Sequence, residues 1–226
     1  MPSKYTSKAS LEDAEELAKS LRVHYKTKSI DGLFNTLKNS FDNDFKGMPE
    51  DIAEENFQAR IRGITLMGFA NKFKGMVLAT SNKSELAVGY STIYGDMVGG
   101  FCVLKDVPKT IVYKLAKHIN KKEMIIPNRI ITREPTAELK FNQTDQDSLP
   151  SYDILDSIIN LYIEQKISPK AIVRQGFDSQ VVKKVVELIH GNEFKRRQSA
   201  PGPKITSKAF SVDRRYPITN RYKPKI

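Results

Sequence analysis

Cysteine, histidine and long apolar runs are all scarce in this chain of 226 residues. The single cysteine, Cys102, excludes an intramolecular disulfide and fits a reducing cytoplasm. The three histidines, His24, His118 and His190, lie far apart, so the sequence supports no transition-metal site. No apolar run approaches the roughly 18 residues that a membrane-spanning helix needs, and the start of the chain has no apolar signal core. We therefore expect a cytoplasmic protein without a membrane anchor.

Positive charge, in contrast, is abundant and unevenly distributed. The formal net charge is +11, and residues 191–226 carry ten Lys and Arg against only Glu193 and Asp213. Such a segment can bind nucleic acid, an anionic membrane or a phosphorylated small molecule, or simply keep the protein soluble. It has no repeated aromatic–basic interleaving, and the chain has no helix-turn-helix or zinc signature, so nucleic acid is the least favoured partner.

The hydrophobic pattern predicts alternating strands and helices. Strands are predicted at 23–27 and 76–79, and helices at 10–21, 30–41, 51–73, 107–118, 151–166, 169–175 and 178–190. Such alternation is typical of an α/β protein with a mostly parallel sheet flanked by helices. The apolar side chains predicted to face the core from two of the helices are Leu33, Phe34, Leu37, Phe41, Ile52, Ile64 and Met67. We also expect Cys102 to be buried as a small apolar residue.

The most informative stretch runs from Leu78 to Asp96. A short buried strand ends at Ala79, and an unbroken polar run follows from Thr80 to Glu85. Polar residues just beyond the carboxyl end of a strand lie where open α/β sheets bind ligands. Ser81 or Asn82 can cap the next helix, which places Glu85 in its first turn, where the helix dipole favours an ionised carboxylate able to hold a metal or a cation. The alternative is a strand, cap and loop without chemistry.

Two further polar features accompany this stretch. On the helix predicted at 51–73, Glu55, Asn56, Arg60 and Arg62 recur at spacings that bring them to one face, which either faces a ligand or forms surface ion pairs. Lys109 follows Pro108 at the start of another helix, where the dipole disfavours a cation unless an anion is nearby. The polar, acidic segment 141–150 is predicted to be a loop.

Several long motifs in a fixed order resemble one known family. They are ENFQARIRG (55–63), LATSNKSELAVGYSTIYGDMVGGFCVLKDVPKT (78–110), REPTAELKFNQTDQDSLPSYDILD (133–156), EFKRRQSAPGPKI (193–205) and DRRYPITNRY (213–222). Together they resemble the synthetase domain of glutamine-dependent NAD synthetases. The resemblance implies an adenine-nucleotide alpha-hydrolase-like α/β fold of the N-type ATP pyrophosphatase kind, and it implies a carbon–nitrogen ligase.

The resemblance also implies a reaction and its participants. Members of the family use ATP and Mg²⁺ to activate the nicotinate carboxylate of deamido-NAD as an acyl-adenylate, releasing pyrophosphate. Ammonia, normally delivered from glutamine by a separate domain, then displaces AMP and leaves NAD. Family domains pair through helices near the deamido-NAD site, so a homo-oligomer is expected.

Matched residue by residue, the family motifs assign roles to eight positions. The positions that correspond to ATP contacts are Thr80, Lys109 and Thr136. Those that correspond to deamido-NAD contacts are Asn56, Arg60, Glu85, Tyr90 and Lys195. Glu85 also corresponds to an acidic residue near the metal.

Two features of the family are not found in this sequence. One is the SGGxDS loop, whose backbone N–H groups cradle pyrophosphate, and the other is the glutaminase domain with its nitrilase-type triad. We therefore expect residues 1–190 to form a synthetase domain truncated at its N-terminal strand or strands. Residues 191–226 would then be a basic tail packing on or over the active site. We expect the chain alone to be inactive and unable to use glutamine. The alternatives are a non-catalytic remnant that binds deamido-NAD or dimerises, and a basic nucleic-acid binder.

Overall fold

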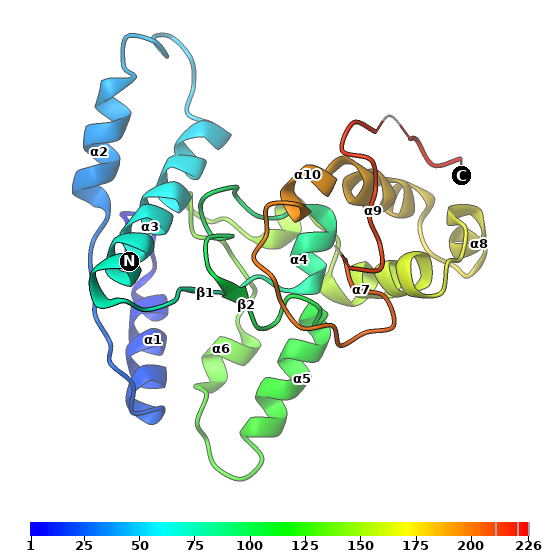
Figure 1. The fold of residues 1–226 in the computed structure, drawn as a ribbon, viewed down its shortest axis with the longest axis horizontal. Coiled ribbons are helices and arrows are strands. Elements are labelled where there is room, and N and C mark those ends of the chain that lie inside the picture. Colours follow the sequence, from blue (N-terminus) through cyan, green and yellow to red (C-terminus); the bar gives the residue numbers. More distant parts are fainter. Residues whose placement is uncertain (211, 221, 226) are drawn as a thin grey trace.

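The computed structural model describes residues 1–210, 212–220 and 222–225. Helices dominate the described chain (Figure 1). In order they are α1 (Lys8–Ser20), α2 (Asp31–Ser40), α3 (Ile52–Phe73), α4 (Lys83–Val88), α5 (Lys109–Ile119), α6 (Asn128–Thr132), α7 (Tyr152–Ile159), α8 (Pro169–Arg174), α9 (Ser179–Gly191) and α10 (Glu193–Arg196). A 3-10 turn, η1 (Asp145–Asp147), precedes α7, and a π-helical turn, η2 (Asn160–Glu164), continues it. The seven helices expected from the hydrophobic pattern are confirmed, with ends shifted by a few residues.

The sheet lies between these helices and consists, in the described chain, of two parallel strands. β1 (Leu78–Ala79) pairs with β2 (Phe101–Cys102), Leu78 opposite Phe101 and Ala79 opposite Cys102. The polar run 80–85 therefore leaves the carboxyl end of β1 and enters α4, as predicted. The prediction that β1 is buried is wrong for Leu78, which is 53% exposed. The outer edge of this short sheet is open to solvent.

The predicted strand at 23–27 is wrong. All these residues are described, and they form an exposed connection between α1 and α2 with no regular structure. Val23 and Tyr25 carry the apolar alternation that suggested a strand, but both side chains are exposed. An alternating segment becomes a strand only when a neighbouring backbone pairs with it.

The main hydrophobic core is built by α4, α7, η2, α8 and α9. Its fully buried members include Leu155, Ile158, Ile163, Val185 and Ile189. Each such side chain contributes about 1.5–3 kcal/mol by leaving water. This core fixes α4, and with it the polar run that follows β1, in the middle of the molecule (Figure 1).

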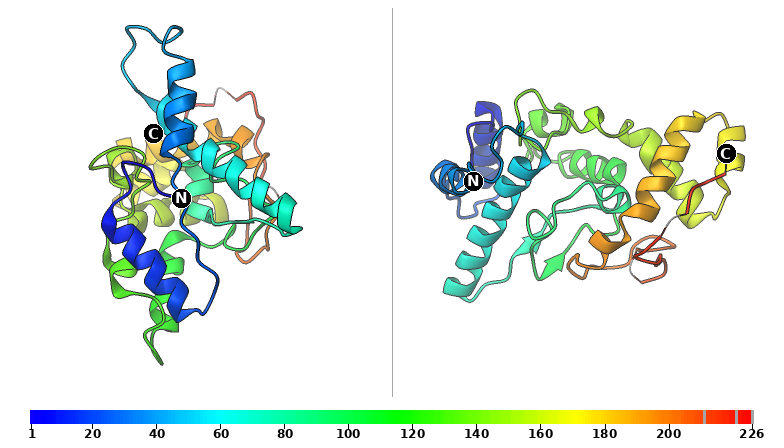
Figure 2. Two further views of the ribbon diagram at one scale, coloured as in Figure 1. Left: turned by 90° about the vertical axis from the view of Figure 1, so that its left-hand side faces the viewer. Right: turned by 90° about the horizontal axis from the view of Figure 1, so that it is seen from above.

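A smaller core joins α2 to α3 at one end of the molecule, while α8 and α9 form the other end (Figure 2). Phe34 and Leu37 pack there as predicted, together with Ile30 and Ile61. The predicted inward orientation of four other side chains is wrong: Leu33, Ile52, Ile64 and Met67 are exposed. On α3 the reason is geometric, because within the described chain α2 and the loop after α4 cover only one side of this long helix.

Candidate functional site

Of the two predicted cap residues, Asn82 caps α4, and Glu85 lies in its first turn as predicted, where it completes a reciprocal cap. The Asn82 side chain accepts a hydrogen bond from the Glu85 N–H (3.0 Å), and the Glu85 carboxylate accepts one from the Asn82 N–H (3.3 Å). This capping box satisfies two N–H groups that the helix cannot satisfy itself. α4 ends at Gly89, whose φ of +68° and close contact with Asn192 leave no room for a Cβ atom. The helix is therefore fixed at both ends.

Glu85 and Lys109 form an ion pair across the starts of α4 and α5. The Lys109 Nζ lies 3.1 Å from the Glu85 Oε1, and both side chains are about one-fifth exposed. Burial lowers the pKa of Lys109, but the Glu85 carboxylate more than offsets this, so the pKa lies above its ordinary value. Lys109 also lies near the ring of Tyr152. Glu85 thus supplies the anion that a cation at this helix start requires.

A cavity of about 1130 Å³ opens beside this ion pair. It is lined by seven of the eight positions that the family motifs singled out, which are Asn56, Arg60, Glu85, Tyr90, Lys109, Thr136 and Lys195. These residues come from α3, α4, α5, α10 and two loops. Small-molecule cavities of roughly 300–1,000 Å³ are typical, so this one is large enough for a small-molecule ligand.

α3 is pressed against the loop that follows α4. Asn56 accepts a hydrogen bond from the Thr92 hydroxyl (2.7 Å), and the Arg60 Nε donates to the Ile93 carbonyl (3.3 Å). A Cβ atom on Gly95 would lie 2.8 Å from the Ala59 Cβ, so only glycine permits this approach. This helix face was predicted either to face a ligand or to form surface ion pairs. Asn56 and Arg60 line the larger cavity, which favours the first interpretation.

Lys195 joins α10 to the same loop. Its Nζ donates to the carbonyls of Gly89 and Ser91, each at 2.7 Å, and burial lowers its pKa. In the sequence, Tyr90 lies between Gly89 and Ser91. Burial, reinforced by the charge of Asp145, raises the pKa of the Tyr90 hydroxyl, so it remains a hydrogen-bond donor. The Tyr90 ring of the loop 89–91 and the Lys195 ammonium of α10 therefore both line the cavity.

Several residues that line the cavity were not singled out from the sequence. Asp145 is buried in η1 and accepts a hydrogen bond from the Tyr152 hydroxyl (2.7 Å). Ser91 carries a buried hydroxyl that has no hydrogen-bond partner within the described residues. Segment 141–150 was predicted to be a loop, and its acidic residues gave a signal that Asp145 could be functional. Ser91 gave no signal, because its burial depends on α10 packing against the loop.

Thr80 lies apart from the other seven positions. It is exposed and lines a second, apolar hollow of about 650 Å³ beside α3, together with Leu66, Phe73 and Leu78. Asp96 lines both this hollow and the larger cavity. Thr136 lies in the larger cavity, where its hydroxyl accepts a hydrogen bond from the Glu138 N–H (3.1 Å). The two hollows thus flank the loop that follows α4.

Three features were expected to be absent or buried: a metal site, a reactive thiol and a membrane-spanning helix. In the part of the chain that the structure describes, no three His, Cys, Asp or Glu side chains gather to form a metal site. Cys102 is buried, as predicted, against the Ser81 carbonyl, and burial raises the pKa of its thiol. Among the described helices, none has both the length and the apolar character needed to cross a membrane.

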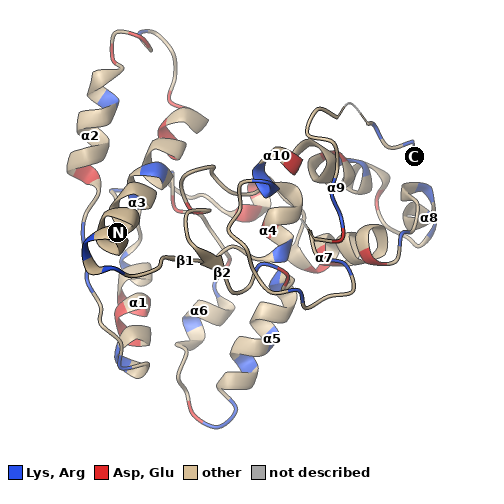
Figure 3. Ribbon diagram, in the orientation of Figure 1, with Lys and Arg blue, Asp and Glu red and all other residues tan. Residues whose placement is uncertain are grey.

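The C-terminal segment packs on the scaffold of the site. Phe210 and Tyr216 enter the main core, and Ala200 packs on Ala79 and Cys102. Lys and Arg occur along this segment and on α5 and α10 (Figure 3). Among the described residues, the last in the sequence to line the cavity are Phe194 and Lys195. A separate basic tail at residues 191–226 stays a prediction.

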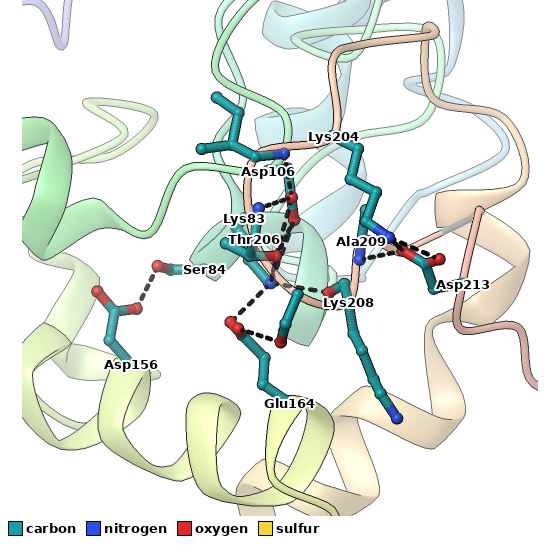
Figure 4. Close-up of polar contacts among 12 residues, drawn as sticks. Lys83, Ser84, Asp106, Asp156, Glu164, Lys204, Thr206, Lys208, Ala209 and Asp213 are labelled. Atoms are coloured by element: carbon teal, nitrogen blue, oxygen red, sulfur yellow. Dashed lines mark hydrogen bonds and ion pairs between the residues drawn. The ribbon is translucent and has the colours of Figure 1, made fainter.

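A buried lysine fastens this segment to α4. Lys83 is fully buried, and its Nζ contacts Asp106 (3.1 Å), Glu164 (2.9 Å) and the Thr206 hydroxyl, as well as the Lys208 carbonyl (2.9 Å) (Figure 4). Burial raises the pKa of Asp106, but backbone hydrogen bonds from Thr206 and its neighbour, with the charge of Lys83, bring it below the ordinary value. The Thr206 hydroxyl and the Lys208 carbonyl thus tie α4 to this segment, while Asp106 and Glu164 balance the buried charge of Lys83.

A cavity beyond the carboxyl end of a parallel strand, with polar groups at two helix starts, is characteristic of nucleotide-binding α/β proteins. Comparison with known families agrees with this class. The sequence model of the NAD synthase family matches residues 1–199, and the chain belongs to this family. The family predicted from the motifs is therefore confirmed, and with it the adenine-nucleotide alpha-hydrolase-like fold.

Individual proteins similar to this chain are NAD synthetases. A glutamine-dependent NAD(+) synthetase from Acinetobacter baylyi is 54% identical over 226 residues, covering 99% of this chain and 42% of that protein. The structure of a glutamine-dependent NAD+ synthetase from Acinetobacter baumannii, in complex with ADP, is 49% identical with a TM-score of 0.58, covering 100% and 41% of the two chains. An NH3-dependent NAD synthetase from Campylobacter jejuni, in complex with nitrate, is 26% identical with a TM-score of 0.65, covering 91% and 76%. The chain spans about two fifths of the length of the curated relatives it matches.

Proposed function

We propose that this chain is the synthetase part of an NAD synthetase and binds deamido-NAD and ATP. The observation that carries the proposal is the cavity, because seven positions matched by the family motifs line it although they come from separate segments. The expected enzyme class, a carbon–nitrogen ligase, agrees with the names of the relatives. ADP in the Acinetobacter baumannii structure agrees with an adenine nucleotide as co-substrate.

The reaction proposed has two steps. A nicotinate oxygen attacks the α-phosphorus of ATP, and the bond to pyrophosphate breaks, which leaves an acyl-adenylate. Ammonia then attacks the acyl carbon, AMP leaves, and the nitrogen loses a proton to give the amide. A carboxylate is a poor acyl donor, so the first step supplies a leaving group; the protein's part is to orient the reactants and balance phosphate charge.

Residues of the cavity suit these tasks. Lys109 and Lys195 are half-buried cations that can meet phosphate oxygens, and the Tyr90 ring offers a surface on which a flat base or nicotinate ring can stack. From α3, Asn56 offers its side-chain amide and Arg60 its guanidinium to a bound ligand. The buried Ser91 hydroxyl lacks a partner within the described chain, which suits a group that a ligand satisfies.

Magnesium fits this site only as an ion shared with phosphates. Mg²⁺ is usually held by one or two carboxylates plus substrate phosphates, and Glu85 is the carboxylate that lines the cavity beside Lys109. Glu85 would hold the ion once Lys109 turns to a phosphate. When bound, the ion neutralises charge on the phosphates.

The isolated chain is proposed to bind deamido-NAD without turning it over. The sequence has no SGGxDS phosphate loop, and Lys109 and Thr136 cannot replace its row of backbone donors. Ammonia would come from glutamine through a separate domain, as the names of the long relatives imply. A homo-oligomer and a cytoplasmic location belong to the same proposal. A remnant that only binds or dimerises remains the second candidate.

An assay of NAD formation separates the two candidates. The purified chain receives deamido-NAD, Mg-ATP and excess ammonium, with glutamine alone as a control, and we expect no turnover from the folded protein. The same chain joined to a preceding segment that carries SGGxDS, taken from a long relative, should form NAD from ammonium. Failure of the joined, folded protein to form NAD would overturn the synthetase assignment and leave the remnant.

A further inference from the structure

α5 begins without a cap of its own, although it carries Lys109. Its N-cap residue is Pro108, whose side chain has no hydrogen-bond acceptor. The first N–H groups of a helix need acceptors from outside the helix, and a buried helix start without them is destabilised. The acceptors must therefore come from other elements.

Two side chains from different helices supply these acceptors. The Ser84 hydroxyl of α4 accepts from the Lys109 N–H (2.8 Å). One oxygen of the Asp156 carboxylate, on α7, accepts from both the N–H and the hydroxyl of Thr110 (2.9 and 2.8 Å). Its other oxygen accepts from the Ser84 hydroxyl (Figure 4). These hydrogen bonds form a closed set among α4, α5 and α7.

This set of contacts adjoins the Glu85–Lys109 ion pair in sequence on both sides. In the sequence, Ser84 precedes Glu85 and Thr110 follows Lys109. The two residues that hydrogen-bond to Asp156 are therefore immediate neighbours of the two members of the ion pair. Ser84 is fully buried, which leaves α4 no freedom to shift against α5. The other charged or titratable groups that face Lys109 are Tyr113, Asp145 and Tyr152.

We propose that Asp156 is a positioning residue that holds Lys109 against Glu85 at the edge of the cavity. Asp156 lies outside the cavity lining and acts through Ser84 and Thr110, as a cap that α7 provides for α5. Its consequence for ligand binding rests on the proposed function, whereas its effect on the ion pair does not.

The test measures the ion pair directly in the whole chain. Lysine labelled with ¹³C at Cε reports the ammonium pKa by NMR, and the Lys109 signal is assigned from its loss in Lys109→Arg. Asp156→Asn keeps the size of the side chain but removes one of its two acceptor oxygens. We expect the pKa of Lys109 to fall in this variant, because Glu85 no longer holds the ammonium. The matched control, Asp153→Asn on the exposed side of α7, should leave the pKa unchanged.

The outcomes separate positioning from mere stabilisation. An Asp156→Asn protein that is folded, by circular dichroism, with the wild-type Lys109 pKa overturns the proposal even if its melting temperature falls. If that variant does not fold, Thr110→Val removes only the hydroxyl bond and should lower the Lys109 pKa, while Thr110→Ser should not. Equal pKa values in those two variants would also overturn it.

A double-mutant cycle then tests the consequence for ligands. Asp156→Asn should weaken deamido-NAD binding by roughly tenfold, the loss expected for one charge-assisted hydrogen bond, and should have no further effect in a Lys109→Met background. Equal losses in both backgrounds would show that Asp156 does not act through Lys109. A fall in the Lys109 pKa without any deamido-NAD binding by the wild type would support the positioning role and reject the proposed function.

Discussion

At the scale of single residues, the account depends on charges that are held in place before any ligand arrives. Lys195 is an example, because two carbonyl groups of the loop 89–91 fix its ammonium at the cavity. Lys195→Met should weaken deamido-NAD binding by roughly tenfold, since a half-buried charged contact contributes about 1.5–3 kcal/mol. Isothermal titration calorimetry measures this, with the exposed Lys183→Met on α9 as control. Equal affinities for both variants would remove Lys195 from the site.

Lys83 is the residue whose loss should cost most stability. Asp106 and Glu164 both contact its ammonium in a buried environment, and removing one partner of such a network leaves carboxylates without a counter-charge. We expect Lys83→Met to lower the free energy of unfolding by about 3–5 kcal/mol. Urea denaturation measures the difference, and Lys114→Met on the exposed side of α5 should change it by less than about 0.5 kcal/mol. A wild-type midpoint for Lys83→Met would contradict this role.

At the scale of elements, His190 at the end of α9 couples the tail to pH. Its ring bonds to the Tyr162 hydroxyl (2.7 Å) and to the Asn220 amide (3.0 Å) and packs against Tyr216 and Tyr222. Burial, reinforced by Arg214, lowers the pKa of His190 to about 4.

The direction of the pH effect follows from that shift. The unfolded chain takes up this proton near pH 6.5, whereas the folded chain resists it until about pH 4, so stability falls as pH drops through this window. The loss reaches about 3 kcal/mol per molecule at the lower end. His190→Gln should flatten the dependence of the unfolding midpoint on pH between these values, whereas His118→Gln on α5 should not. An unchanged slope in His190→Gln would contradict the role given to this ring.

How far the sequence predicts these elements depends on whether their partners are local. The cap at the start of α4 lies within four residues, so a cap by Ser81 or Asn82 with Glu85 in the first turn could be predicted, and the structure confirms Asn82. The predicted strand at 23–27 is wrong because pairing requires a second strand, which sequence alternation cannot supply. The orientation of Ile64 on α3 was wrong for a related reason, since tertiary contacts decide which side of a helix is covered.

The candidate site shows the same division. Family motifs pointed to eight positions, and seven converge on one cavity, while Thr80 lies in the neighbouring hollow. The contribution of Ser91 and the cap that Asp156 gives to α5 could not be predicted, because both depend on helices distant in the sequence. The periodicity of the sequence predicts where helices begin and end. It does not predict which side chains from distant helices meet, because this depends on tertiary packing.

At the scale of the whole molecule, an apolar face along α3 and β1 stands out. Leu66, Phe73, Met76 and Leu78 line the apolar hollow beside α3 together, and Phe73 is 73% exposed. Exposed apolar patches of this kind mark interaction surfaces. The proposed homo-oligomer provides a partner for this face.

Sedimentation velocity tests that proposal. The wild type should sediment as an oligomer at micromolar concentrations, and Phe73→Lys should shift it towards the monomer, because a buried charge without a partner opposes association. The control, Leu115→Lys on exposed α5, should leave the oligomer intact. A monomeric wild type, or a Phe73→Lys protein that associates normally, would contradict the use of this face.

The most direct test of the central claim is a calorimetric titration of the folded chain with deamido-NAD. The cavity predicts saturable binding at one site per chain, and an Asn56→Ala, Arg60→Ala double variant that retains its fold should lose most of this affinity. Saturation in the wild type together with that loss would place deamido-NAD against α3 and the loop after α4. Absence of binding by the wild type, or full affinity in the double variant, would contradict the account.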